Sequence, residues 1–169
     1  MSELQRPIPL ADINRHAVTR RVEATPAEEA ALAKRLNVEA LSGLKADLTA
    51  VKRHGIILVS GTFEAQVRLV CVVSLEPFDT VLAGEIEEEF VESDHREEPT
   101  ELDIDLDTPE PLSGDTLDVG ELVAQCLALE IDPHPRAPQV DLSELEAPEP
   151  DGVDPAHPFA ELRKLQGKA

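Results

Sequence analysis

Aromatic residues are nearly absent from this sequence. The chain has 169 residues but no Trp and no Tyr, and its four phenylalanines are Phe63, Phe78, Phe90 and Phe159. A chain of this length can bury a sizeable hydrophobic core. We therefore predict a core built from the aliphatic side chains of Leu, Val, Ile and Ala.

Cysteine and long apolar runs are also scarce. The two cysteines, Cys71 and Cys126, are too few for a disulfide framework and are typical of a reducing compartment. The stretch MSELQRPIPLADINR lacks the apolar run and the small-residue cleavage site of a signal peptide. No run of about 18 apolar residues predicts a membrane-spanning helix. We therefore expect a cytoplasmic protein.

Positively charged residues are outnumbered. The sequence has 15 Lys and Arg against 35 Asp and Glu, which gives a formal net charge of −20. Residues 1–60 contain nine bases and seven acids, and the remainder contains six bases and 28 acids. Such an acidic body repels phosphate backbones, which argues against nucleic-acid binding through the whole surface. It fits attraction to a basic partner, or a solvated acidic surface that binds nothing.

Two segments have the signals of helices. In TPAEEAALAKRLN, Thr25 is the expected N-cap and Glu28 completes a capping box. Lys34 and Arg35 lie in the last turn, where positive charge complements the helix dipole. In DVGELVAQCLALEI, Asp118 is the expected N-cap and apolar residues recur every three or four positions.

Alternating apolar and polar residues between these helices predict strands. The pattern runs through residues 43–53, resumes after His54-Gly55 in residues 56–71, and appears again in residues 80–91. Residues 1–24 are expected to be extended. The sequence therefore predicts an α+β fold, in which an antiparallel meander packs against two main helices and one sheet face is solvated. On that solvated face we place Glu85, Glu87 and Glu89.

Composition suggests where the domain ends. We predict one domain over residues 1–133, with an acidic flexible loop at about residues 92–117, followed by a Pro-rich linker over residues 134–157. Residues 158–169 then form a short amphipathic C-terminal helix with an apolar side made of Phe159, Leu162 and Leu165. This segment could dock on a partner or fold back onto the sheet, and the sequence leaves both open.

Cys71 and Ser74 have the spacing of a metal-binding Cys-x-x-Cys pair that lacks its second thiol. A structural zinc site needs four ligands, commonly in closely spaced pairs, and Ser is a poor zinc ligand. The strand pattern instead places Cys71 on the apolar face, where a free Cys acts as a small hydrophobic side chain. The five histidines are scattered, and no phosphate-binding or nucleophile motif is present. We therefore predict a protein that is not an enzyme and that needs no metal or cofactor.

Several segments carry a family resemblance in their order and spacing. They are ATPAEEAALAKRLNVEAL, LKADL, CVVSLEPFDTV, LDVGELVAQCLALEIDPHPR and HPFAEL. Over roughly residues 10–165 they resemble the YceD family, the large ribosomal RNA subunit accumulation proteins, in the form common in alphaproteobacteria. Many members have Cys-x-x-Cys, so the resemblance implies that Cys71 and Ser74 are a degenerate pair. The resemblance also implies that the turn formed by Leu75, Glu76, Pro77 and Phe78 is a structural element or a contact surface.

The resemblance implies a part in accumulation of 23S rRNA and biogenesis of the 50S subunit, without catalysis. Two kinds of contact are open. Precursor 23S rRNA could touch the basic residues Arg15, Arg20, Arg21, Lys34, Arg35, Lys52 and Arg53. Alternatively, the acidic strand and loop could hold a basic ribosomal protein, which the net charge favours as the main contact.

Two other function classes compete with this interpretation. One is an acidic interaction module or nucleic-acid mimic that binds a basic partner unrelated to ribosomes. The other is a small rRNA-cleaving enzyme with a carboxylate site at residues 87–89 or 103–107. We rank both below the assembly factor.

Overall fold

The computed structural model describes residues 3–92, 109–112 and 114–140. The chain divides into two compact units, residues 1–137 and 138–169, and every helix and strand described below belongs to the first. The described residues of this unit form a large β-sheet, a small two-stranded sheet and three helices. The predicted α+β class is therefore confirmed.

The large sheet is the antiparallel meander that the alternation predicts. Its strand order is β2-β3-β4-β5-β6, and the first four strands pair antiparallel with their neighbours. The strands are β2 (Val18–Glu23), β3 (Ala40–Arg53), β4 (Ile56–Val70), β5 (Pro77–Glu92) and β6 (Glu110–Leu112). The short β6 pairs in parallel with the end of β5, which the sequence pattern did not predict.

Backbone geometry explains how the long strands turn and bend. His54 and Gly55 have φ values of 52° and 89°, so the β3–β4 hairpin turns through two residues in the left-handed region. The register of β3 shifts between Ser42 and Lys45, and Gly43 there has φ 64°. A glycine adopts this angle without the steric cost of a Cβ, as expected at a β-bulge.

The helices begin where the capping residues predict. Helix α2 (Pro26–Leu36) starts at Thr25, whose hydroxyl accepts the Glu28 N–H while the Glu28 carboxylate accepts the Thr25 N–H. Helix α3 (Val119–Glu130) starts at Asp118, whose Oδ1 accepts the N–H groups of Gly120 and Glu121. Both predicted N-caps are confirmed.

Two expectations about irregular segments were wrong. Residues 1–24 are not extended throughout, because Leu10–Ile13 form the short helix α1 and thereby bury Leu10 and Ile13. The end of the predicted acidic loop is also structured. It contains β6 and β7 (Thr116–Asp118), and β7 pairs antiparallel with β1 (Pro7–Pro9). Residues 93–108 of that loop, and the predicted C-terminal helix, lie outside the described residues.

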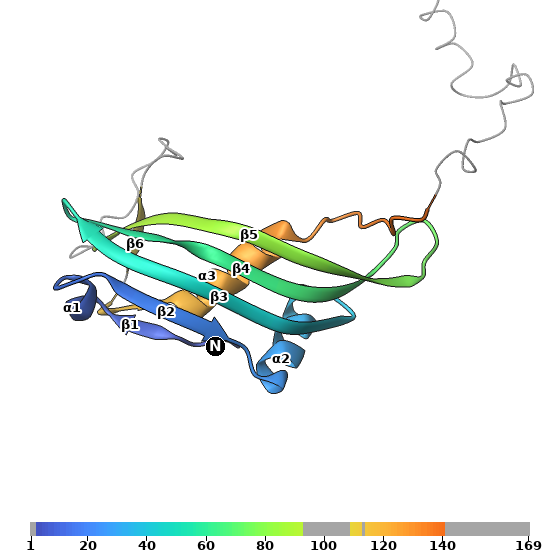
Figure 1. Ribbon diagram of the computed structural model, residues 1–169, viewed down its shortest axis with the longest axis horizontal. Coiled ribbons are helices and arrows are strands. Elements are labelled where there is room, and N and C mark those ends of the chain that lie inside the picture. Colours follow the sequence, from blue (N-terminus) through green and yellow to red (C-terminus); the bar gives the residue numbers. More distant parts are fainter. Residues whose placement is uncertain (1–2, 93–108, 113, 141–169) are drawn as a thin grey trace, which may run out of the picture. The chain divides into compact units, whose positions relative to one another are not determined.

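The core is aliphatic, as predicted. One cluster of buried side chains draws Val, Leu, Ile and Ala from both sheets and all three helices, and Phe63 and Phe90 are the only aromatic residues among its buried members. In Figure 1, α3 crosses one face of the large sheet. Within the described ranges, no helix is long and apolar enough to cross a membrane.

Candidate functional site

Strand β5 presents a row of acidic side chains on the outer face of the large sheet. Ile86 and Phe90 point to the opposite, inner face and are buried in the core. Since side chains alternate along a strand, the odd-numbered residues lie on the outer face. Glu85, Glu87 and Glu89 are all exposed there, as predicted.

These three glutamates have no cation opposite them. Their register partners on β4 are Thr62, Ser60 and Leu58. Elsewhere on the same face charges are matched, because Arg68 contacts Asp79 at 2.7 Å and Lys45 contacts Glu64 at 3.4 Å. In the part of the chain that the structure describes, none of the three glutamates forms an ion pair. The row, which we call the acidic row, is therefore an uncompensated negative stripe.

The seven basic residues proposed for RNA contact do not form one patch. Arg20 and Arg21 are neighbours in β2, so strand alternation directs them to opposite faces of the sheet. Lys34 and Arg35 lie on α2, and Arg15 lies between α1 and β2. Alternation along β3 separates Lys52 from Arg53 in the same way. The structure thus disperses these side chains over several surfaces.

Several of these cations are already paired. Arg35 bonds Glu121 through both terminal nitrogens, at 2.6 and 2.8 Å, and Glu3 at 3.0 Å. Lys52 contacts Glu92 at 2.9 Å, and Arg21 contacts Glu23 at 2.8 Å. Within the described ranges, no ion pair is found for Arg15, Arg20, Lys34 or Arg53. These four side chains are therefore the ones of the seven that remain available to bind an anionic partner.

The hairpin between β4 and β5 exposes apolar side chains. Leu75 is 75% exposed and has φ 59°, and Val72 is 46% exposed. Of the predicted contact residues, Glu76 and Pro77 are also exposed, whereas Phe78 is half-buried and packs against the core. The sequence grouped these four residues as one surface, but alternation turns Phe78 inward.

Cys71 closes the base of this hairpin and is fully buried. Its Sγ accepts the Ser74 N–H at 3.5 Å, and its own N–H donates to the Glu76 carbonyl at 2.9 Å. Hydrogen bonds from the Ser74 side chain, and then from the amides of Ser74 and Ala137, lower the pKa of the Cys71 thiol to about 7 against the effect of burial. Ser74 thus occupies the second position of the pair as a hydrogen-bonding residue.

The surroundings of Cys71 do not fit a metal site. A closed zinc site needs four nitrogen, sulfur or oxygen ligands. Among the described residues, no three His, Cys, Asp or Glu side chains are placed so that they could hold a metal ion together. The other cysteine, Cys126, lies on α3 and is half-buried, and burial raises the pKa of its thiol.

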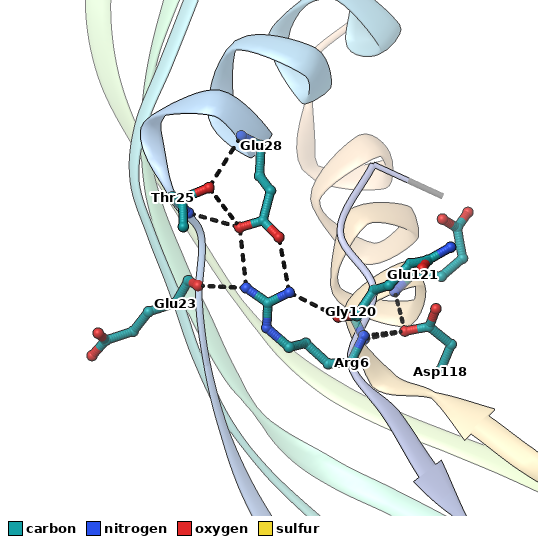
Figure 2. A network of polar contacts seen from close by, with 8 residues as sticks. Arg6, Glu23, Thr25, Glu28, Asp118, Gly120 and Glu121 are labelled. Carbon is teal, nitrogen blue, oxygen red and sulfur yellow. Dashed lines mark hydrogen bonds and ion pairs between the residues drawn. The ribbon is translucent and has the colours of Figure 1, made fainter. Parts of the chain in front are cut away.

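A polar network that the sequence did not predict joins the N-terminus to two helices (Figure 2). The Arg6 guanidinium bonds both carboxylate oxygens of Glu28, at 2.9 and 3.1 Å, and the Glu23 carbonyl at 3.0 Å. The Arg6 N–H donates to Asp118 Oδ1 at 2.8 Å. Arg6 therefore contacts the N-cap regions of both α2 and α3. Nothing in the local sequence indicates this, because the partners are distant along the chain.

Residues Phe159, Leu162 and Leu165 of the predicted C-terminal segment lie outside the described residues, as do residues 103–107. The remaining candidates thus comprise the acidic row, the exposed hairpin and four dispersed cations.

Comparison with known proteins adds one match. A family model described as large ribosomal RNA subunit accumulation protein YceD matches residues 59–166, more than half of the chain. No curated protein and no solved structure matches. The matched range begins within β4 and includes the hairpin, the acidic row and α3. The chain therefore belongs to the YceD family, which is named for accumulation of the large ribosomal RNA subunit.

Proposed function

We propose that this protein is a non-enzymatic factor that supports 23S rRNA accumulation and 50S subunit biogenesis by binding a ribosomal protein, precursor rRNA or both. The observation that carries this proposal is the family match over residues 59–166. The sequence segments that resemble the family resemble its alphaproteobacterial form, so we expect the protein to come from an alphaproteobacterium. Catalysis has no part in the proposal.

We assign the main contact to a basic ribosomal protein and not to RNA. The acidic row supports this assignment, because its three carboxylates have no ion-pair partner among the described residues and so attract cations and repel phosphates. The dispersal of the basic residues weakens the RNA route, since counterion release grows with the number of phosphates contacted at once. Arg15, Arg20, Lys34 and Arg53 remain available for a smaller, secondary RNA contact.

A pulldown of the full-length protein from growing cells at graded salt tests the proposal, with bound RNA and bound proteins both identified. We expect large-subunit proteins and 23S precursors to be recovered at low salt and lost as salt rises. Treatment with RNase separates the routes, because proteins bound directly remain after RNA is degraded.

Two matched variants locate the contact. The first neutralises the acidic row with Glu85→Gln, Glu87→Gln and Glu89→Gln, and the second neutralises three exposed cations with Arg15→Gln, Arg20→Gln and Arg53→Gln. We expect the first variant to lose most of the ribosomal proteins and the second to retain them. The reverse result would assign the main contact to RNA.

The pulldown and a cleavage assay with the purified protein separate the competing classes. Recovery of a basic nucleic-acid-binding protein without ribosomal components, competed away by added nucleic acid, would replace the proposal with a nucleic-acid mimic. Cleavage of 23S precursors by the purified protein would replace it with an enzyme.

A further inference from the structure

Strand β5 is an open edge over most of its length. Among the described residues, one side pairs with β4 from Pro77 to Val91, whereas the other side pairs only with β6, at Phe90, Val91 and Glu92. Among the residues that the structure describes, no strand lies beside residues 77–89 on that side. At about 3.3 Å per residue, this edge is roughly 40 Å long. Figure 1 shows β5 at the border of the sheet, with β6 near one of its ends.

The hydrogen-bond pattern identifies which backbone groups face outward. The Cys71 N–H donates to the Glu76 carbonyl, and the β4–β5 register continues from there without a shift. In an antiparallel pair, alternate residues bond the neighbouring strand, so even-numbered residues of β5 bond β4. Odd-numbered residues direct their backbone groups to the open side. Their N–H groups are those of Asp79, Val81, Ala83, Glu85, Glu87 and Glu89.

The two sides of this edge differ in chemistry. The outer side has the acidic row, together with Val81, which is 59% exposed. On the inner side, Thr80, Leu82 and Gly84 are only partly buried, so the core does not use all of their surface, and Glu88 nearer the β6 end is an exposed carboxylate. A strand added here would place one set of alternate side chains beside the acidic row. Over residues 80–84 it would place the other set beside small or aliphatic residues.

The acidic row also restricts what can add to the edge. Like charges directly opposite each other destabilise a strand pair, so a second copy of β5 would bring its own glutamates against this row. Residues 93–108 follow β5 and have seven acids and one arginine, which is the same sign of charge. Charged residues are a common protection of exposed edges. Here that protection excludes acidic strands but attracts basic ones.

We propose that the open edge of β5 binds an extended, Lys- or Arg-rich protein segment by strand addition, with basic side chains on the outer side and small apolar side chains on the inner side. This inference rests on the proposed function and deepens it, because it names the binding mode and the kind of segment bound. Main-chain hydrogen bonds supply affinity in such complexes, and alternate side chains supply specificity.

A synthetic peptide of four Lys-Val repeats tests the inference with the full-length protein. We expect binding by calorimetry at low salt, with amide shifts in NMR spectra at Val81, Ala83 and Glu85. Two further peptides carry N-methyl groups on every lysine or on every valine, so charge is kept while alternate donors are lost. We expect one of these modifications to weaken binding at least tenfold. Equal binding of all three peptides would overturn the inference, because charge alone would explain it.

A pair of proline variants tests the edge itself. Ala83→Pro removes an N–H that faces the open side and leaves the β4–β5 bonds in place, so we expect the peptide to bind at least tenfold more weakly. The control is Thr19→Pro on β2, the strand at the opposite border of the sheet. The Ala24 N–H bonds the Leu44 carbonyl, which places the Thr19 N–H on the outward side in the same way. This control should bind as the original protein does.

Failure of this inference is distinguishable from failure of the proposed function. If the original protein and Ala83→Pro recover large-subunit proteins equally in the pulldown, the edge inference is wrong and the function stands. If Ala83→Pro abolishes a dimer seen in the absence of peptide, the edge belongs to a second copy and the inference is overturned. Amide spectra that match those of the original protein outside β5 confirm that each variant is folded.

Discussion

Arg6 connects three parts of the chain through one side chain and one amide. The guanidinium bonds Glu28 at the start of α2, and the backbone N–H bonds Asp118 at the start of α3. Hydrogen bonds from Arg6, and then from the Thr25 amide, lower the pKa of the Glu28 carboxyl to about 2. Glu28 is therefore both a helix-capping residue and the anchor of the N-terminal segment.

Replacing Glu28 tests this network. We expect Glu28→Gln to lower the free energy of unfolding by about 0.5–1 kcal/mol near neutral pH, because glutamine still accepts the Thr25 N–H but loses the charge that binds Arg6. Because the folded-state pKa is lowered from 4.5, the stabilisation is complete above the unfolded value and is lost as pH falls toward about 2. Urea unfolding from pH 2 to 7 should show the two proteins converging at low pH. A constant difference across that range would contradict the assigned role.

At Gly120, in the first turn of α3, helix propensity favours alanine whereas packing against Leu4 favours glycine. A Cβ at this position would overlap the carbonyl oxygen of Leu4. Alanine favours a helix over glycine by about 1 kcal/mol, but overpacking against a backbone atom costs about 1–3 kcal/mol. We expect Gly120→Ala to be destabilising overall in thermal unfolding. Gly114→Ala is not a suitable control, because the φ of Gly114 is 104° and alanine would be strained there. The control is Ala128→Gly at an exposed position of α3, which measures the difference in helix propensity between alanine and glycine alone.

At the scale of elements, the acidic row should weaken the fold that carries it. Glu85, Glu87 and Glu89 are spaced by about 6.7 Å along one strand, within the screening length of about 10 Å at 0.1 M salt. They have no ion-pair partner in the described structure. We therefore expect Glu87→Gln to leave thermal stability unchanged or raise it slightly at low salt, with the difference disappearing at 1 M salt. Glu64→Gln, which removes the partner of Lys45, is the control and should not be stabilising.

Local signals predicted the long elements well. Alternation located β3, β4 and β5, and capping residues located the starts of α2 and α3, because these features depend on neighbours within a few residues. The small sheet of β1 and β7 was missed because each strand has only three residues, too few to show a period. Helix α1 was missed for the same reason.

The site residues were predicted less completely than the elements. Exposure of Glu85, Glu87 and Glu89 follows from alternation within one strand. The dispersal of Arg20, Arg21, Lys34 and Arg35 depends on the relative placement of several elements, which no local pattern specifies. The open edge of β5 was not predicted either, since edge and central strands of an antiparallel sheet can share the same alternation.

At the scale of the whole molecule, the C-terminal limit of the domain remains a prediction. The sequence places the linker from residue 134, yet the Val72 N–H donates to the Pro135 carbonyl at 2.9 Å and Ala137 is 5% exposed. Truncation after residue 140 should therefore preserve the unfolding temperature of the full chain. Truncation after residue 133 should cost about 1–2 kcal/mol, because it removes a hydrogen bond and a buried methyl group. Equal stability of the two truncated proteins would support the boundary at 133.

The pairing of β1 with β7 has a consequence for how the chain folds during synthesis. Ile8 and Leu117 are register partners, and the sequence between them contains strands β2 to β6. The β3–β4 and β4–β5 hairpins can form as soon as they emerge, since their loops are short, whereas closing β1 onto β7 must wait for residue 118. At translation rates of about 5–20 residues per second, that delay is roughly 5–20 s. During this interval the first strand made has no partner strand, so the N-terminal segment is the part of the nascent chain most exposed to chaperones and proteases.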